Sequence, residues 1–258
     1  MLVATWNVNS LNARMPRVQE WLERVGPDVL CLQETKMGDA QFPALDFQRL
    51  GYDSVHHGQG RWNGVAILSR VGIDEPVYGF DDGEDPDPDA RIVWARCNGV
   101  LVCSVYVPNG RALDDDHYRY KLEWLARLRR VLDDRCSPEE HLVILGDWNV
   151  TPADIDVWDP AAFVGSTHVS EPERQAIASL RDWGLVDTLR ERYPQDGIYS
   201  YWDYRNGDFH KRRGMRIDYL LSSRSLAARS VADLIDRNAR KGTKPSDHAP
   251  VMAEFDLS

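Results

Sequence analysis

Short apolar runs recur along the chain at the length expected of β-strands. Each run is four to eight residues long, is rich in valine, leucine and isoleucine, and is bounded by polar or turn-forming residues. We therefore predict strands at Leu2–Trp6, Asp28–Leu32, Gly64–Leu68, Arg91–Cys97, Val100–Val107, Leu142–Leu145, Arg216–Leu221 and Pro250–Phe255.

Three segments between these runs carry apolar residues at helical spacing. In the first, Val18, Leu22 and Val25 recur at i, i+4 and i+7 before a Gly-Pro stop. The third begins with a Ser-Glu-Pro-Glu capping box at Ser170 and ends at Gly184. The second is a longer stripe that consists of Tyr118, Leu122, Leu125, Leu128 and Leu132.

No linker, low-complexity block or change of composition divides the chain, so we expect one domain, residues 1–258. Strands and helices mixed at this spacing predict an α/β protein in which sheets pack on each other with helices outside. A short internal repeat favours two similar halves, because Trp-Asn-Val follows an apolar run both at Trp6 and at Trp148. The chemistry is then expected in the loops at the strand ends.

The charge of the chain is acidic overall but unevenly distributed. The net charge of −10 by itself disfavours a nucleic-acid partner. Much of it comes from Asp81–Asp89, which we interpret as a solvated acidic loop and a surface insertion. Basic residues gather in Arg205–Arg216 and in Arg237–Lys244, and such a basic face can contact phosphates.

The cysteines and the apolar segments indicate the compartment. Cys31, Cys97, Cys103 and Cys136 form no CxxC pair, and we interpret them as free thiols in a reducing cytoplasm. No apolar run approaches the length of a membrane span, and the first ten residues do not resemble a secretory signal. We therefore expect a cytoplasmic protein that does not bind membranes.

Polar side chains of one chemical kind follow or open several of the predicted strands. Any one of them alone is commonly a turn, a helix cap or an ordinary hydrogen-bonded pair. Together they are carboxylates, amides and one imidazole, without a thiol, which suits a hard cation such as Mg²⁺ rather than zinc. The set is Asn7, Glu34, Asp147, Asn149, Asp218, Asp247 and His248.

These residues lie in motifs by which the chain resembles the exonuclease III group of the exonuclease–endonuclease–phosphatase superfamily. The resemblance extends almost from end to end. It implies the DNase I-like fold, a four-layer α/β sandwich of two mixed β-sheets packed face to face with helices on the outside. The motifs are Thr5-Trp6-Asn7-Val8-Asn9, Leu32-Gln33-Glu34-Thr35-Lys36, Asn63-Gly64-Val65-Ala66, Tyr106-Val107-Pro108-Asn109-Gly110, Gly146-Asp147-Trp148-Asn149, Arg216-Ile217-Asp218-Tyr219 and Ser246-Asp247-His248-Ala249-Pro250.

The resemblance implies a metal site for Mg²⁺, with Mn²⁺ as the alternative. Glu34, with Asn7 nearby, would hold the ion that neutralises the scissile phosphate and stabilises the leaving 3′ oxygen. Asp247 would lie beside this ion or at a second one, which leaves the number of metals open. The full set of candidate ligands is Asn7, Glu34, Asp147, Asn149, Asp247 and His248.

The resemblance also implies five catalytic residues. Asp147 would align and deprotonate the attacking water or protonate the leaving group. His248, oriented by Asp218, would hydrogen-bond the phosphate or help to activate the water, so the identity of the general base stays open. Asn149 would donate to the phosphoryl oxygens in the transition state, and Tyr106 would touch the phosphate through its hydroxyl.

The residues implied for substrate binding extend beyond the catalytic set. Tyr201, Met215 and Ile217 would form a small apolar pocket for a flipped-out sugar that lacks its base, and such a pocket favours abasic DNA. Asn109 would lie beside the phosphate, and Arg111, with the basic loop Lys211–Arg213, would clamp the duplex.

The sequence thus predicts a monomeric DNA-repair hydrolase that cuts duplex DNA 5′ to abasic sites. It would also remove nucleotides or blocking groups from 3′ ends, in a balance that the sequence leaves open. A first alternative is a superfamily phosphoesterase on another substrate: an RNA deadenylase, an inositol phosphatase or a sphingomyelinase. A second is a non-catalytic DNA-binding protein.

Overall fold

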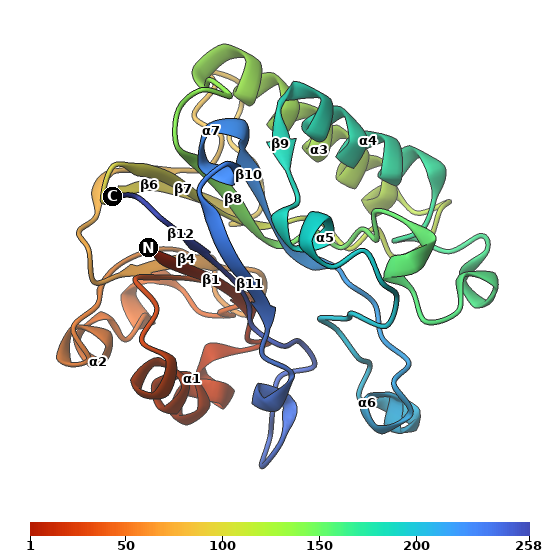
Figure 1. Ribbon diagram of the computed structural model, residues 1–258, viewed down its shortest axis with the longest axis horizontal. Coiled ribbons are helices and arrows are strands. Elements are labelled where there is room, and N and C mark those ends of the chain that lie inside the picture. Colours follow the sequence, from red (N-terminus) through yellow and green to blue (C-terminus); the bar gives the residue numbers. More distant parts are fainter.

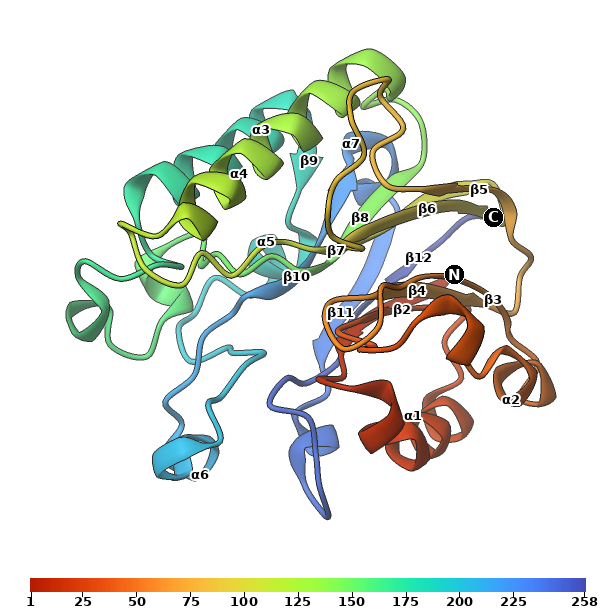
Figure 2. The same ribbon diagram turned by 180° about the vertical axis from the view of Figure 1, so that it is seen from behind.

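Two six-stranded mixed sheets pack face to face, and helices cover their outer faces (Figure 1, Figure 2). The computed structural model describes residues 1–258, apart from the side chain at position 206. The first sheet has the strand order β11-β12-β1-β2-β4-β3, and the second has the order β5-β6-β7-β8-β10-β9. This arrangement confirms the predicted four-layer α/β sandwich of the DNase I-like kind.

The strands of the first sheet are β1 (Leu2–Asn7), β2 (Val29–Gln33), β3 (Asp53–His57), β4 (Val65–Ser69), β11 (Ser230–Ile235) and β12 (Val251–Phe255). Those of the second are β5 (Asp74–Tyr78), β6 (Ile92–Cys97), β7 (Val100–Tyr106), β8 (Leu142–Asp147), β9 (Leu185–Val186) and β10 (Asp218–Ser223). Two central pairs, β1 with β2 and β7 with β8, are parallel, and the other ladders are antiparallel.

The helices divide between the two outer faces. Helices α1 (Leu11–Val25) and α2 (Ala44–Arg49) pack on the first sheet, and α3 (Asp116–Arg135) and α4 (Glu171–Trp183) pack on the second. Three short helices complete the fold: α5 (Thr188–Arg192), α6 (Asp208–Lys211) and α7 (Arg224–Ala227). No helix within the described part of the chain is long and apolar enough to cross a membrane.

Alternation along the strands explains the layers. In β1, Val3 points into the apolar cluster between the two sheets, whereas Ala4 and Trp6 point into the cluster beneath α1 and α2. Both faces of the central strands are therefore covered, which is why these strands are continuous apolar runs in the sequence.

All eight predicted strands are present, with ends that differ by up to two residues, but four further strands were not predicted. Strands β3, β5 and β11 lie at sheet edges and are mostly exposed or half-buried, and β9 is only two residues long. Exposed edge strands carry polar residues and so lack the apolar run that reveals a buried strand. Helix α1 begins at Leu11, before the first residue of the predicted apolar pattern, Val18, and ends before Gly26 as predicted.

The acidic segment Asp81–Asp89 is a surface loop, as predicted, and most of its residues are exposed, but ion pairs attach it to α3. Asp82 accepts hydrogen bonds from Nε and Nη2 of Arg127 on α3, at 2.7 and 2.6 Å, and its side chain is only 12% exposed. The arginine lowers the pKa of Asp82 to about 2. The segment therefore packs against α3 through ion pairs.

The two halves meet with equivalent strands at the centre. Strands β1 and β8 each have a parallel neighbour on one side and an antiparallel neighbour on the other, and the repeated Trp-Asn-Val segment lies across the end of β1 and directly after β8. The ends of both strands therefore lie at the same end of the sandwich, where side chains from the two sheets can meet.

Candidate active site

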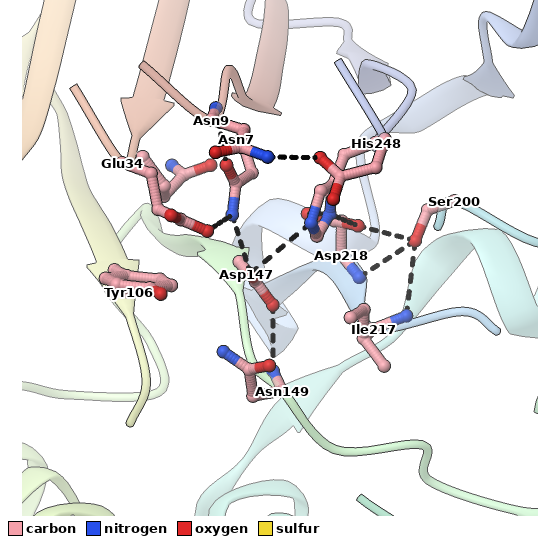
Figure 3. A network of polar contacts seen from close by, with 12 residues as sticks. Asn7, Asn9, Glu34, Tyr106, Asp147, Asn149, Ser200, Ile217, Asp218 and His248 are labelled. Carbon is pink, nitrogen blue, oxygen red and sulfur yellow. Dashed lines mark hydrogen bonds and ion pairs between the residues drawn. The ribbon is translucent and has the colours of Figure 1, made fainter. Parts of the chain in front are cut away.

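The polar residues predicted from the sequence gather where the central strands end (Figure 3). Asn7 ends β1 and Asp147 ends β8, and the Asn7 amide nitrogen donates to Asp147 Oδ2 at 2.8 Å. The same nitrogen donates to Glu34 Oε1, also at 2.8 Å. One buried amide thus joins carboxylates that come from different sheets.

Glu34 follows β2 in a tight turn with a backbone φ of 51°. Burial alone would raise the pKa of its carboxyl, but Lys36 and the Asn7 amide outweigh burial and lower it. Lys36 Nζ lies 2.8 Å from Glu34 Oε2. The carboxylate is therefore ionised at neutral pH and can bind a cation.

Asp147 has the opposite behaviour because it is buried among other acids. Burial, together with Asp218 and Glu34, raises the pKa of Asp147 to about 7, although His248 opposes the rise. Its second oxygen accepts a hydrogen bond from the Asn149 backbone nitrogen at 3.0 Å. A carboxyl with a pKa near neutrality can both accept and release a proton under physiological conditions.

His248 precedes β12 and is held by Asp218 at the start of β10. Its Nδ1 lies 2.8 and 3.0 Å from the two carboxylate oxygens of Asp218, and its Nε2 lies 3.9 Å from Asp147 Oδ2. Burial would lower the pKa of His248, but Asp218 and Asp147 raise it to about 10. The imidazole is therefore a charged donor, with Nε2 facing the carboxylate cluster.

Asn149, Asn109 and Tyr106 form the other wall of the site. The Asn149 amide nitrogen donates to Val107 O at 2.9 Å, and its oxygen accepts from the Asn109 amide at 3.1 Å. Burial, Glu34 and Asp147 raise the pKa of Tyr106 well above its usual value, so its hydroxyl keeps its proton. Arg91 lies over the Tyr106 ring, 4.8 Å from its centroid.

Asp247 lies beside the cluster rather than in it. Its Oδ1 accepts from the Asn9 amide at 3.1 Å, and the Asn9 oxygen accepts from Lys36 Nζ at 2.6 Å. Among the described residues, the three that bring ligand atoms within 4.8 Å of one another are Glu34, Asp147 and His248. Asp247 is thus linked to this group through Asn9.

Comparison with known proteins agrees with this geometry. Residues 4–248 match the model of the endonuclease/exonuclease/phosphatase family. The chain is 33% identical to exodeoxyribonuclease III of Haemophilus influenzae, over 99% of this chain and all of that protein. The chain belongs to this family. It is a hydrolase, a DNA-repair nuclease of the exodeoxyribonuclease III type, and this excludes the non-catalytic alternative.

Two solved structures of the family overlie the whole chain. An AP endonuclease from Archaeoglobus fulgidus is 38% identical with a TM-score of 0.96, and both chains are covered completely. A 3′ phosphatase from Neisseria bound to a product DNA hairpin is 42% identical with a TM-score of 0.95, again with complete coverage. One relative is an AP endonuclease and the other a 3′ phosphatase bound to DNA, so the alternative substrates outside DNA are not favoured.

The donor set suits the metal that the family implies. Glu34 and Asp147 offer carboxylate oxygens, and Asn7 offers an amide oxygen that accepts, among the described residues, one hydrogen bond, from the Asn9 backbone nitrogen at 2.9 Å. No thiol belongs to the group. Oxygen donors of this kind fit a hard divalent cation.

The predicted sugar pocket lies beside His248 but is nearly closed. Met215 and Ile217 pack with Val157 and Tyr201, and they are only 6% and 3% exposed. The Tyr201 ring lies 4.8 Å from the His248 ring, centroid to centroid. The cluster therefore borders the catalytic group and offers little open apolar surface.

Two predicted DNA contacts lie outside this group. Arg111 is exposed, and its backbone nitrogen donates to Asn109 Oδ1 at 3.2 Å. The basic segment Lys211–Arg213 lies at α6, which projects from the body of the molecule (Figure 1), and Arg213 lies over the ring of Trp158, 4.9 Å from its centroid.

One residue of the site had no signal in the sequence. Ser200 Oγ donates to Asp218 Oδ2 at 2.7 Å and accepts the backbone nitrogens of Ile217 and Asp218 (Figure 3). It fixes the carboxylate that orients His248. A serine between two tyrosines in a loop carries no pattern that would set it apart.

Proposed function

We propose that this nuclease hydrolyses phosphate esters at 3′ ends and at abasic sites of double-stranded DNA, with Mg²⁺ or Mn²⁺ bound at Glu34. The observation that carries the proposal is the buried group of Glu34, Asp147 and His248, joined by Asn7 across the two sheets. When bound, the ion would supply positive charge at the scissile phosphate and the leaving oxygen.

The protonation states favour a division of labour between Asp147 and His248. We assign the general base to Asp147, because a pKa of about 7 lets its carboxylate take a proton from water at neutral pH. His248 has a pKa of about 10 and would donate a hydrogen bond to the phosphate. Asp218 holds the imidazole in this orientation.

Neutral donors would complete the phosphate site. The Tyr106 hydroxyl retains its proton, so it can donate to a phosphoryl oxygen. The Asn149 amide has a second hydrogen that its bond to Val107 does not use, and Asn109 lies directly beside it. Fixed donors of this kind stabilise the charge that develops in the transition state. Asp247 would support this site through Asn9 or take part in a second metal site.

The small space left in the sugar pocket allows the candidate substrates to be ranked by size. A 3′-phosphate needs room only for the phosphate beyond the scissile bond, whereas an abasic site or a terminal nucleotide adds a deoxyribose. Because Met215 and Ile217 are almost fully buried, we propose 3′-phosphate removal as the reaction that this arrangement accommodates most readily. Incision 5′ to an abasic site is the second candidate, since an apolar cluster with Tyr201 does border His248.

A panel of labelled duplexes tests this ranking. One duplex carries a 3′-phosphate, one an internal tetrahydrofuran abasic analogue, and one an undamaged recessed 3′ end, each with Mg²⁺ or with EDTA. We expect Mg²⁺-dependent release of phosphate to be the fastest reaction. Faster incision at the analogue would reverse the ranking, and equal rates in EDTA would overturn the metal site.

Asp147→Asn tests the assigned base in the same assay. Loss of the proton acceptor should lower kcat by roughly a thousandfold, within the usual range for a general base. The control is Asp154→Asn, because Asp154 has a side chain that is 71% exposed and pairs only with Arg174. Wild-type kcat in folded Asp147→Asn would contradict the assignment.

We further propose that residues 1–258 act as one domain, as a monomer and in the cytoplasm. The support is that one chain supplies every residue of the candidate site, from both sheets. The four cysteines are free thiols, which suits a reducing compartment. Light scattering on a sizing column would test the monomer, and a dimer at micromolar concentration would refute it.

A further inference from the structure

A buried ion pair lies directly behind the phosphate-facing wall of the site. Lys121 on α3 and Glu173 on α4 form this pair, and neither side chain has any exposed surface. Burying two charges costs free energy unless every donor and acceptor is matched. The pair takes no part in the catalytic roles proposed above, so its contacts are informative.

The ammonium group of Lys121 points at the backbone of the site. Its Nζ donates to Asn149 O at 2.6 Å and to Asn109 O at 3.3 Å. It also contacts Thr167 Oγ1 at 3.5 Å and the Glu173 carboxylate. The two carbonyls belong to the two asparagines that are proposed above to contact the phosphate.

Glu173 gathers the remaining donors. Its Oε1 accepts from Thr167 Oγ1 at 2.7 Å and from the His168 backbone nitrogen at 2.9 Å. Its Oε2 accepts from the backbone nitrogen and hydroxyl of Ser170, at 3.1 and 2.6 Å. Asn109 O lies 3.0 Å from the same Thr167 hydroxyl, whose single hydrogen is shared between the two acceptors, and His168 Nδ1 contacts Asn149 O. The carboxylate is fully satisfied and ties α4 to the same two carbonyls.

The backbone at Asn149 needs such an anchor. Its φ is 51°, in the left-handed region, and its nitrogen is already held by Asp147 Oδ1. The nitrogen and the carbonyl thus fix the backbone from which the side chain projects, and the amide itself is held by its bonds to Val107 O and to Asn109. Next to Asn109, Gly110 has a φ of 88°, and a Cβ there would lie 2.5 Å from Thr167 Oγ1. The backbone that carries Asn109 and Asn149 is therefore packed tightly against the residues around the Lys121–Glu173 ion pair.

We propose that Lys121 is a positioning residue for phosphate hydrolysis: it fixes the Asn149 and Asn109 carbonyls and thereby aims their amides at the phosphoryl oxygens. The inference rests on the phosphate-binding roles proposed for these two asparagines. Small displacements of groups that stabilise a transition state lower kcat strongly, because their geometry is matched to that state. Ground-state binding of DNA depends on many other contacts and should change less.

The test compares a variant in which only Glu173 loses its charge with a double variant in which both members of the pair do. Glu173→Gln keeps the Lys121 donors, and we expect its kcat to stay within about threefold of wild type. Lys121→Met combined with Glu173→Gln removes these donors without leaving a buried charge. Its kcat on a 3′-phosphate duplex should fall by roughly tenfold to a hundredfold, with KM within about threefold.

Leu132→Ala is the stability control, because Leu132 is a fully buried residue at the other end of the same helix. All assays are run well below the lowest Tm in the set. A merely structural role predicts equal kcat in the double variant and in Leu132→Ala, and that result would overturn the proposal. A loss of kcat in the double variant alone supports it.

Thr167→Val provides a second route if the double variant does not fold. It removes the hydroxyl that donates to Asn109 O and leaves Lys121 and Glu173 in place. We expect Thr167→Val to lower kcat several-fold and Thr167→Ser to keep wild-type kcat. Wild-type kcat in Thr167→Val would overturn the proposal. Asn149→Ala separates the role of Asn149 in phosphate binding from its positioning by Lys121. Wild-type kcat in this variant would refute the proposed phosphate contact of Asn149 itself.

Discussion

Two carboxylates surround the imidazole of His248, and their distances decide which one controls it. Asp218 lies 2.8 Å from Nδ1, whereas Asp147 lies 3.9 Å from Nε2. Both favour the charged imidazole, against the effect of burial, and Asp218 contributes more. Ser200 holds the Asp218 carboxylate in place. The protonation of His248 is thus set mainly by Asp218, a residue that need not touch the substrate.

Asp218→Asn should therefore lower the pKa of His248 from its value of about 10, because burial remains while the nearest negative charge is lost. The freed imidazole would also lose its fixed tautomer, and we expect kcat to fall by roughly tenfold to a hundredfold. An NMR titration of the His248 ring signals measures the pKa directly. Asp208→Asn at α6 is the control, and an unchanged His248 pKa would contradict the expectation.

At the scale of elements, burial decided what the sequence could predict. The central strands are covered on both faces, so their apolar runs were visible, whereas exposed β5 and β11 were not. The α3 stripe was predicted to include Leu122, but the structure buries Lys121 instead. A lysine reads as solvent-exposed unless its partner is known, and Glu173 is 52 residues away. Most of the candidate site was predicted because polar residues at the ends of buried strands stand out.

A second buried group braces the turn that carries Glu34. His56 on β3 lies 2.8 Å from Thr35 Oγ1 through Nε2 and 2.8 Å from Asp39 Oδ1 through Nδ1. Burial lowers its pKa to about 4, although Asp39 opposes this. A histidine whose folded pKa lies below its unfolded value of about 6.5 stabilises the fold above pH 6.5. That stability is lost as the pH falls from about 6.5 towards 4.

His56→Gln should therefore flatten the dependence of stability on pH. Between pH 7.5 and 5.0 the wild type should lose about 2 kcal/mol more unfolding free energy than the variant, since 1.5 pKa units separate pH 5.0 from 6.5. Urea unfolding at the two pH values gives the difference. His210→Gln, at an exposed histidine, serves as the matched control. Equal losses in the wild type and His56→Gln would show that the imidazole is not responsible.

At the scale of the molecule, the candidate site connects the two sheets of the sandwich. Asn7 from the first sheet binds Asp147 from the second, and Glu34 from the first sheet lies within 4.8 Å of both Asp147 and His248. A cation bound at Glu34 would therefore lie close to the carboxylate that the second sheet contributes. Ions that bind the folded state alone stabilise it by mass action, so the occupancy of the site should be visible in the unfolding of the whole chain.

Mg²⁺ at a hundredfold excess over its Kd should add about 2.7 kcal/mol and raise Tm by roughly 5 to 10 °C. The rise should be larger at pH 8 than at pH 6, because the pKa of Asp147 is about 7 and its negative charge, which favours a cation at the neighbouring Glu34, develops only as its proton leaves. Glu34→Gln should lose most of the rise, whereas Glu171→Gln, at an exposed position on α4, should keep it. Calorimetry with and without EDTA measures all four differences. A rise that survives Glu34→Gln in full would place the ion elsewhere, and none at either pH would mean that the ion binds only together with DNA.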